Sequence, residues 1–524
     1  MAGGIYEEPL EVRIGTVEAI LPSAASYPYP ALQLGEGVSL HTFESVVLEN
    51  DFLRVVVVPS LGGRIWSIFD KRTQSEFLGE AQLQEGGKRG VVWERGIRFA
   101  LQGEERATDL GDVSYSIVEG ENGRPDELWL AEAANGSNLS WHLKLWLEPE
   151  TACLFIEGRV LARSMKSIAY QPGFLFWPRS GSFYCTWSEG WRFRQARHLA
   201  PHQLDTFTVQ IAPYTGFDAT HMSPHLAIRL GDEKLLLFSS ERILDGKLVL
   251  LTDQGPVEAK LSLHPEKQEE IDLAPLGRIR EAALLDAQGI TLISSMTEKD
   301  LSEPDDNSPI DLYGKSMDEL RSLLFSTASR HAAHFGLGIR YLDAGDFELA
   351  DHHFDQSLLY NGEDSIAWCI RAAIERLRGE SAEESQFLLN AHFLAPLDPL
   401  LRAEGLLRQP QPHSALIQPI ASRHGDLIQV ACDLIECRLY QDAAKWIEAC
   451  ISIEDVPMLR ILRAFVVLKH AGLEFECLDD LARAAAKPLA PPYPWRQIEK
   501  EAIAELLNRF PDHERLAQLA ELLP

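Results

Sequence analysis

The pattern of apolar residues changes near residue 300, and this change limits the possible folds more than any other feature of the chain. Before it, short β-branched or alternating runs recur between turn-like clusters, as in residues 64–69 and 139–147. After it, Leu, Ala and charged residues recur with helical spacing. An apolar period of two indicates strands, and a period near 3.6 indicates helices. The sequence therefore predicts an all-β region followed by an all-α region.

The first region contains well over ten candidate strands at short spacing, and few segments between them could form a crossover helix. This pattern is typical of an antiparallel sandwich or barrel. Residues 139–147 alternate most clearly, so successive side chains point to opposite faces of the sheet. One face is apolar and is expected in the core: Leu139, Trp141, Leu143, Leu145 and Leu147. The other is polar and aromatic, and faces either solvent or the floor of a groove: Ser140, His142, Lys144 and Trp146.

Residues 299–318 are rich in acidic residues, Ser and Pro, and lack helical apolar spacing, which is typical of a linker. We therefore predict a β-sandwich domain over 1–298 and a helical domain over 319–524. Residues 334–362 have the landmark spacing of a tetratricopeptide repeat, and a step of 34 residues from His334 reaches Trp368. Such repeats bury their apolar faces by stacking, which predicts an array that either binds a partner segment or braces the β-domain.

Charge and cysteine content exclude several classes of protein. Lys and Arg total 49 against 78 Asp and Glu, a net charge of −29, so nucleic acid and anionic membranes are not expected partners. No apolar run approaches the ~18 residues of a membrane span, and the first residues do not resemble a secretory signal. Seven cysteines without a C-x-x-C pair favour reduced thiols and a cytoplasmic location. The sequence contains no nucleotide-binding loop, so we expect no cofactor. Two pairs of histidines have the i, i+4 spacing of a metal site on a helix, but Pro201 and Pro224 interrupt them, so we expect no metal.

Two segments have the residue types of a sugar site. Residues 170–193 are dense in aromatic side chains with Arg and Glu between them, and sugar C–H faces stack on such rings. A packed sandwich core with an aromatic-rich loop explains the same pattern. Residues 93–98 combine Trp93, Glu94, Arg95 and Arg98, and guanidinium groups bind carboxylates or hydroxyl pairs bidentately. An ordinary strand edge with alternating salt bridges is the other interpretation.

Residues 49–55 (ENDFLRV) and 59–65 (PSLGGRI) resemble the opening of galactose-mutarotase-like domains. They are most similar to an uncharacterised bacterial family in which such a domain precedes tetratricopeptide repeats, and residues 251–258 (LTDQGPVE) resemble a late segment of that family. The resemblance implies a β-supersandwich with a concave face that binds a sugar or glycan. Mutarotases use an acid and a base at this face, and related glycosidases use carboxylate pairs.

The resemblance also implies roles for particular residues. Glu258 matches the position of a late-strand base, with Glu94 or Glu189 as its acid partner. The expected substrate-binding residues are Arg64, Trp93, Arg98, Trp177, Trp187, Trp191 and His198. Arg98 and Ala100 replace a Glu and an Asn of the family pattern. We therefore keep two hypotheses: an enzyme resembling a glycoside hydrolase or aldose epimerase, and a non-catalytic sugar-binding or protein-interaction scaffold that uses the helical repeats.

Overall fold

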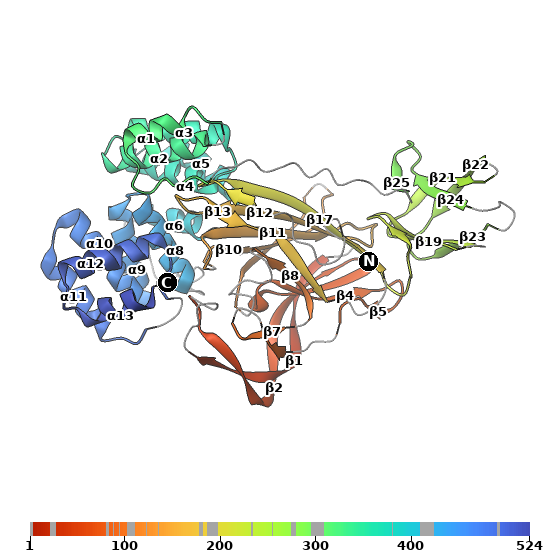
Figure 1. Cartoon of the computed structure of the whole chain (residues 1–524), viewed down its shortest axis with the longest axis horizontal. Helices are drawn as coiled ribbons and strands as arrows, with labels where there is room; N and C mark the ends of the chain where they lie inside the picture. Colours follow the sequence, from red (N-terminus) through yellow and green to blue (C-terminus); the bar gives the residue numbers. More distant parts are fainter. Residues whose placement is uncertain are drawn as a thin grey trace.

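The computed structural model describes residues 4–20, 28–79, 83–86, 89–93, 95–101, 111–121, 123–134, 136–177, 182–185, 197–231, 234–253, 255–273, 279–294, 309–327, 329–379, 381–408, 424–489 and 493–523. Its β-strands end at Ser294 and its helices begin at Met317, which confirms the predicted order of a β region and an α region (Figure 1). None of the described helices is both long enough and apolar enough to cross a bilayer.

The main β region is a sandwich of two antiparallel sheets. The first has the order β1 (Gly4–Ile20), β2 (Ala31–Glu49), β3 (Leu53–Val58), β4 (Arg64–Asp70), β8 (Gly96–Ala100) and β14 (Gly173–Trp177), with β5 (Ser75–Glu76) paired to β4. The second has the order β15 (Ser182–Cys185), β17 (Leu204–Tyr214), β12 (Leu154–Ala162), β11 (Leu139–Leu147), β10 (Glu127–Glu132) and β9 (Ser114–Val118). One apolar core joins their inner faces and includes all five predicted inward residues of 139–147.

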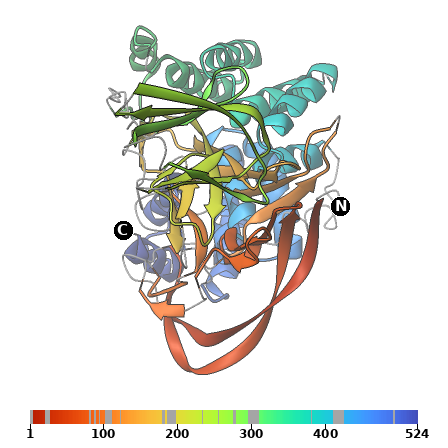
Figure 2. The same ribbon diagram turned by 90° about the vertical axis from the view of Figure 1, so that its right-hand side faces the viewer.

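The hairpin of β1 and β2 is much longer than the rest of its sheet. Only the last part of β2 pairs with β3, and the remainder of the hairpin arches away from the sandwich (Figure 2). Beyond its far end, Tyr29 Oη donates to the carbonyl of Ala134 at 2.7 Å, and Tyr493 N donates to the carbonyl of Pro28 at 3.0 Å. The hairpin thus reaches from the sandwich to the helical region.

Residues 221–294 form a smaller β module with a core of its own. One sheet contains β18 (His221–Met222), β19 (Leu226–Leu230), β20 (Lys234–Ser239) and β23 (Gln268–Asp272). The other contains β22 (Gly255–Leu263), β21 (Ile243–Thr252), β24 (Ile279–Leu285) and β25 (Thr291–Ser294). The sequence predicted one sandwich domain over 1–298, and the structure places two separate cores within this range.

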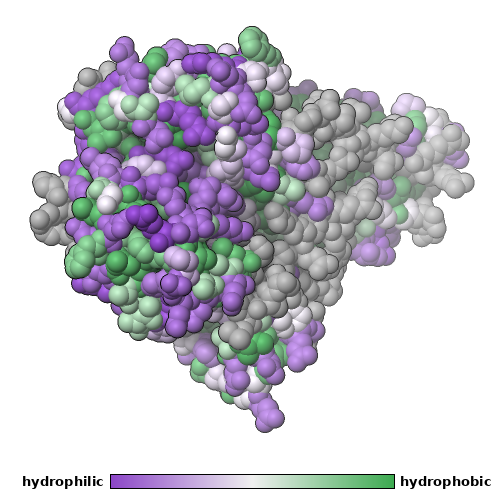
Figure 3. Space-filling view, turned by 60° about the vertical axis from the view of Figure 1, so that its left-hand side comes forward, coloured by the Kyte–Doolittle hydropathy of each residue, from purple (hydrophilic) through white to green (hydrophobic). Residues whose placement is uncertain are grey.

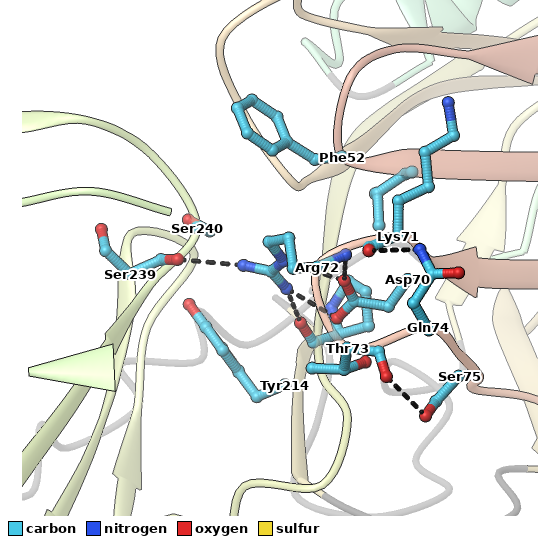
Figure 4. Close-up of polar contacts among 12 residues, drawn as sticks. Phe52, Asp70, Lys71, Arg72, Thr73, Gln74, Ser75, Tyr214, Ser239 and Ser240 are labelled. Atoms are coloured by element: carbon cyan, nitrogen blue, oxygen red, sulfur yellow. Dashed lines mark hydrogen bonds and ion pairs between the residues drawn. The ribbon is translucent and has the colours of Figure 1, made fainter. Parts of the chain in front are cut away.

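Arg72 joins the module to the sandwich (Figure 4). Its guanidinium forms two hydrogen bonds with Asp70, both at 2.9 Å, and both side chains are almost completely buried. The same group donates to the carbonyls of Ser239 at 2.9 Å and Pro213 at 2.6 Å, and lies 4.4 Å from the centre of the Phe238 ring. One buried cation therefore connects the β4–β5 turn, β17 and the module.

The helical region is an array of antiparallel helix pairs. The described helices are α1 (Met317–Leu323), α2 (Arg330–Asp343), α3 (Phe347–Tyr360), α4 (Ser365–Arg378), α5 (Ser381–Leu394), α6 (Pro399–Leu407), α8 (His424–Glu436), α9 (Tyr440–Ile453), α10 (Pro457–Ala471), α11 (Glu474–Ala485), α12 (Gln497–Arg509) and α13 (Glu514–Leu522). Aspartates cap several N-termini, as Asp398 accepts a hydrogen bond from Leu400 N at 2.9 Å. An apolar core runs through the array.

The array and the sandwich share part of this core, because Leu161 and Met165 of the sandwich belong to it. Arg163, in the loop after β12, is buried between two helices and forms ion pairs with Asp398 at 2.5 Å and with Asp433. Residues 309–316 lie within the predicted linker, yet Leu312 is buried and its N–H donates to the carbonyl of Met165 at 2.7 Å. The second half of the predicted linker is therefore packed between the two regions.

Candidate functional site

Three residues predicted to bind sugar come together on the outer face of the first sheet. Ile65 of β4 pairs with Ile97 of β8, so the antiparallel register places Arg64 opposite Arg98. Arg64 is fully buried, and its Nη1 donates to the carbonyls of Trp93 at 3.0 Å and Arg95 at 2.7 Å. These contacts hold the turn between β7 (Val91–Trp93) and β8.

Trp93 belongs to a second apolar cluster beneath the long hairpin. Its ring lies 5.2 Å from that of Trp66 in an edge-to-face arrangement, and Val12 of β1 packs in the same cluster. Only 3% of Trp93 and 4% of Arg98 are exposed. In this structure the predicted stacking residue and the predicted clamps are interior groups that contact the sheet and the hairpin.

The other predicted site residues are not brought to this cluster. Glu258 is exposed on β22 in the smaller module, where it pairs with Lys247 at 2.8 Å, far from β4 and β8 (Figure 1). His198 is exposed on β16 (Arg197–Leu199), which pairs with β13 (Ile168–Tyr170). The backbone of Trp177 pairs with Gly96 on β8. Four predicted residues lie outside the described residues: Glu94, Glu189, Trp187 and Trp191.

The outer face of the second sheet carries a different group of aromatic and polar side chains. Strand register aligns them in two rows across β10, β11, β12 and β17. We call these eight residues the platform: Glu127, Trp146, Phe155 and Gln210 in the first row, and Trp129, Lys144, Glu157 and Thr208 in the second. They alternate with core residues, which fixes them on the solvent side of the sheet.

Lys144 lies at the centre of the platform. Its Nζ is 2.8 Å from Glu157 and 3.6 Å from Glu127, and it lies over the rings of Trp146 and Trp129 at 5.3 and 5.8 Å. Ion pairs and cation–π contacts of this kind hold a long side chain in one position. Lys144 therefore fixes two tryptophans and two carboxylates relative to one another.

Part of the platform is accessible, unlike the buried arginine pair, whereas Trp129 is only 9% exposed and packs against Leu397 of the helical region. Trp146 and Phe155 are half-buried, with their rings stacked at 5.5 Å and an interplanar angle of 17°, and Thr208 is exposed. The side chains of Lys144 and Glu157 are 19% and 26% exposed. Such a surface offers both ring edges and hydrogen-bonding groups to a ligand.

Other parts of the chain bound the platform on two sides (Figure 1). On one side, Arg159 Nη1 donates to the carbonyl of Leu394 at the end of α5, at 3.0 Å. His142 is buried there, and burial lowers its pKa to about 4. On the other side, Cys153 and Ala212 pack against the smaller module. The platform therefore lies on the part of the sheet between the contacts with the helical array and those with the module.

The carboxylates of the platform are suited to binding. Burial pushes the pKa of Glu157 upward, but the hydrogen bond from Lys144 and the charges of Lys144 and Arg159 hold it below its ordinary value. Glu157 is thus ionised near neutral pH and accepts hydrogen bonds. A glycosidase acid needs the opposite shift, a raised pKa.

Sequence reasoning found only part of the platform. The alternation of 139–147 identified Lys144 and Trp146 as one face and left open whether that face was a groove floor. The signals for Trp129, Phe155 and Glu157 were also present, because their strands were predicted. Their neighbours across the sheet depend on strand order and register, which the sequence alone does not specify.

Comparisons with known proteins find one family match and several distant similarities to solved structures. Residues 22–185, which include most strands of the sandwich, match the family model described as Domain of unknown function (DUF5107). A TPR-domain containing protein from Parabacteroides distasonis is 13% identical with a TM-score of 0.31, covering 97% of this chain and 96% of that one. A galactose mutarotase-like protein from Lactobacillus casei is 10% identical with a TM-score of 0.20, covering 44% of this chain and 98% of that one.

A polysaccharide lyase is also 10% identical, with a TM-score of 0.16, and covers 90% of this chain and 82% of that one. At these values none of the three similarities assigns an activity. The family match includes β10, β11 and β12 of the platform, whereas β17 lies beyond it. Residues 22–185 of the chain thus match a domain family whose function is unknown.

Proposed function

We propose that the protein binds carbohydrate without turning it over, and that the platform holds an extended glycan. The observation that carries this proposal is the stacked pair of half-exposed rings, Trp146 and Phe155, beside ionised groups on the outer face of the second sheet. Aromatic rings pack against the apolar faces of sugars, and carboxylate, ammonium, amide and hydroxyl groups bind sugar hydroxyls. A flat platform four strands wide fits a chain of several sugar units better than a single ring.

This proposal keeps the carbohydrate ligand that the resemblance implied but changes the face of the sandwich. The arginine pair on the first sheet is buried, whereas Trp146, Phe155 and Thr208 of the platform are half-buried or exposed. Turnover is not part of the proposal, because Lys144 is paired with both platform carboxylates and Glu157 is held ionised.

We further propose that the helical array braces the sandwich rather than holding a partner. Its helices α6 and α8 already contact the loop that contains Arg163, and α2 contacts the sandwich through His331, whose Nε2 lies 3.1 Å from the carbonyl of Pro201. The outward face of the array is mostly hydrophilic, with separate hydrophobic patches (Figure 3). A solvated surface of this kind fits a structural support.

The platform is tested by measuring the affinity of the full chain for a panel of neutral and acidic oligosaccharides. We expect at least one glycan to bind, and Trp146→Ala to weaken it about tenfold or more, because a tryptophan at the centre of a contact surface contributes on this scale. Trp368→Ala is the matched control, since Trp368 is a half-buried tryptophan of α4 in the helical array.

Arg98→Met distinguishes the two faces of the sandwich. Binding lost in Arg98→Met and retained in Trp146→Ala would place the sugar on the first sheet and contradict the platform. Absence of binding to every glycan in the panel would contradict carbohydrate binding altogether.

A further inference from the structure

A cavity of about 250 Å³ lies where the packed linker meets the helical array. Tyr313 of the linker lines it, together with Arg340 of α2, Glu436 and Arg438 at the end of α8, and Glu501 of α12. The rest of the wall is apolar and includes Leu320, Ile339 and Ile498. None of the residues that line the cavity belongs to the platform, so it is separate from the proposed sugar site.

Arg438 has a backbone conformation that its residue type disfavours. Its φ is +64°, in the left-handed region where a side chain clashes with its own backbone. At the equivalent turns after α2, α4 and α10 the left-handed residue is glycine: Gly345, Gly379 and Gly472. Glycine adopts this conformation without strain. An arginine at the turn after α8 is thus less favourable locally, and such outliers cluster at functional sites.

Only some of the hydrogen-bond donors of the Arg438 side chain have a partner among the residues that the structure describes. Its Nη1 donates to Tyr440 Oη at 2.8 Å, but its Nε is buried with no hydrogen-bond partner among the residues that the structure describes. A buried guanidinium N–H without a partner is unfavourable unless a ligand supplies an acceptor. The second arginine of the cavity, Arg340, donates Nη2 to the carbonyl of Lys315 at 2.9 Å.

The cavity also contains two acidic groups. Glu436 accepts a hydrogen bond from Tyr313 Oη at 2.5 Å, and Glu501 lies close enough to influence the charge of both Glu436 and Arg438. The cavity therefore presents two guanidinium groups, two carboxyl groups and an apolar wall in a small volume. A ligand that uses all three features has a carboxylate, an ammonium group and an apolar tail.

We propose that this cavity binds a small zwitterion with an apolar side chain, of the class of a free aliphatic amino acid. Its carboxylate would accept from Arg438 and Arg340, its ammonium group would donate to Glu501 and Glu436, and its aliphatic part would contact Leu320, Ile339 and Ile498. The volume limits the ligand to a single such molecule and excludes a folded peptide segment.

The test is calorimetric titration of the full chain with L-leucine, alongside 4-methylpentanoate and isopentylamine, which each lack one of the two charges. We expect saturable binding of L-leucine, and binding at least about tenfold weaker for either analogue, because each forfeits its charge-assisted hydrogen bonds. Equal affinity for L-leucine and either analogue would overturn the zwitterion assignment.

Arg438→Gly tests the residue directly, because it removes the guanidinium and restores the residue type of the other turns. We expect it to unfold at the same or a higher temperature than the wild type and to lose L-leucine binding. Gly472→Arg is the reciprocal control and should lower the melting temperature without changing the affinity.

Glu501→Gln is a second variant of nearly identical shape, and keeps the test decisive if Arg438→Gly folds poorly. This variant should bind L-leucine about tenfold more weakly, or weaker still, because one charged hydrogen-bond acceptor is removed. Wild-type affinity in either folded variant, or no binding of any aliphatic amino acid by the wild type, would overturn the proposal.

Discussion

At the scale of single residues, an unusual feature is a buried acid–base pair where the helices meet the sandwich. Asp364 is fully buried and caps α4, accepting hydrogen bonds from Ile366 N and Ala367 N. Its Oδ2 lies 3.6 Å from Nδ1 of His202, whose ring stacks on Phe335 at 3.5 Å. Burial raises the pKa of Asp364 to about 7 and lowers the pKa of His202 well below its usual value. Both groups are therefore neutral in moderately acidic solution.

Asp364 by itself makes the stability fall as the pH rises, whereas His202, whose folded pKa is lowered, acts in the opposite sense below about pH 6.5, so the effect of Asp364 is isolated by comparison with a variant. The folded pKa of Asp364 is above its ordinary value of 3.8, so between about pH 4 and 7 the folded chain holds a proton that the unfolded chain has lost. The contribution of Asp364 to the free energy of unfolding then falls through this window. Asp364→Asn keeps the cap but does not titrate, so the variant should match the wild type near pH 4 and exceed it near pH 8 by up to about 4 kcal/mol.

Denaturant unfolding of both proteins at several pH values measures this difference. A stability difference that stays constant between pH 4 and 8 would show that Asp364 is ionised in the folded protein throughout.

At the scale of elements, the loop after β12 is the main connection between the sandwich and the helical array. Arg163 in this loop has 1% of its side chain exposed and neutralises two buried aspartates from α6 and α8. Asp433 also accepts from Gln429 at 2.8 Å, and Gln429 accepts from Arg496 at 2.7 Å, which extends the network to α12. The position of several helices thus depends on one side chain of the sandwich.

Arg163→Met should therefore destabilise the protein by about 3–5 kcal/mol, because it leaves two buried carboxylates without their cation. Lys166→Met is the matched control in the same loop. Lys166 is largely exposed and lies 3.6 Å from Asp311, so its loss should change the free energy of unfolding by less than about 1 kcal/mol. Thermal unfolding of both variants checks this, and equal effects would mean that the buried network does not hold the array.

The sequence predicted the individual strands and helices better than it predicted which of them lie next to one another. The strands of the sandwich and the helix pairs followed from local periodicity, which each segment carries by itself. The long hairpin of β1 and β2 was not predicted, because residues 4–20 mix Glu, Gly and Pro with apolar residues and gain their partners from distant parts of the chain. Predicting the platform requires the register of four strands, and predicting the role of Arg163 requires the docking of α6 and α8. Neither can be inferred from the spacing of residues in the sequence.

Site residues inferred from family resemblance show the same limit. The structure brings Trp93, Arg64 and Arg98 together, since β4 pairs with β8 and Arg64 donates to the carbonyl of Trp93, but their burial depends on the cover that β1 provides. Glu258 was assigned by its place in a late segment, and that segment belongs to the smaller module instead of the main sandwich. Resemblance in sequence order therefore did not establish proximity in space.

At the scale of the whole molecule, the sandwich lies between the helical array and the smaller module, and buried arginines fasten both sides. Arg163 holds the array, and Arg72 holds the module through Asp70 and the carbonyls of Ser239 and Pro213. The platform lies between these two attachments. Its shape consequently depends on both flanking parts staying in place.

Arg72→Met should release the module while leaving the helical array docked, because it removes the cation of a buried pair, the hydrogen bond to Ser239 of the module and the contact with the Phe238 ring. We expect a loss of about 3 kcal/mol and faster protease cleavage within residues 221–294. Lys71→Met is the neighbouring control, since Lys71 is half-buried and its Nζ pairs with Glu49 at 2.6 Å and donates to the carbonyl of Asn50 at 2.6 Å, both within the sandwich. Equal cleavage rates in the two variants would contradict the role of Arg72.

The account depends most on the claim that glycan lies on the second sheet. The most direct measurement is a crystal structure of the protein soaked with the tightest-binding oligosaccharide from the panel. We predict sugar rings over Trp146 and Phe155, with hydroxyl groups in contact with Lys144 and Glu157. Sugar bound at Arg64 and Arg98, or a platform that stays empty at saturating concentration, would contradict the account.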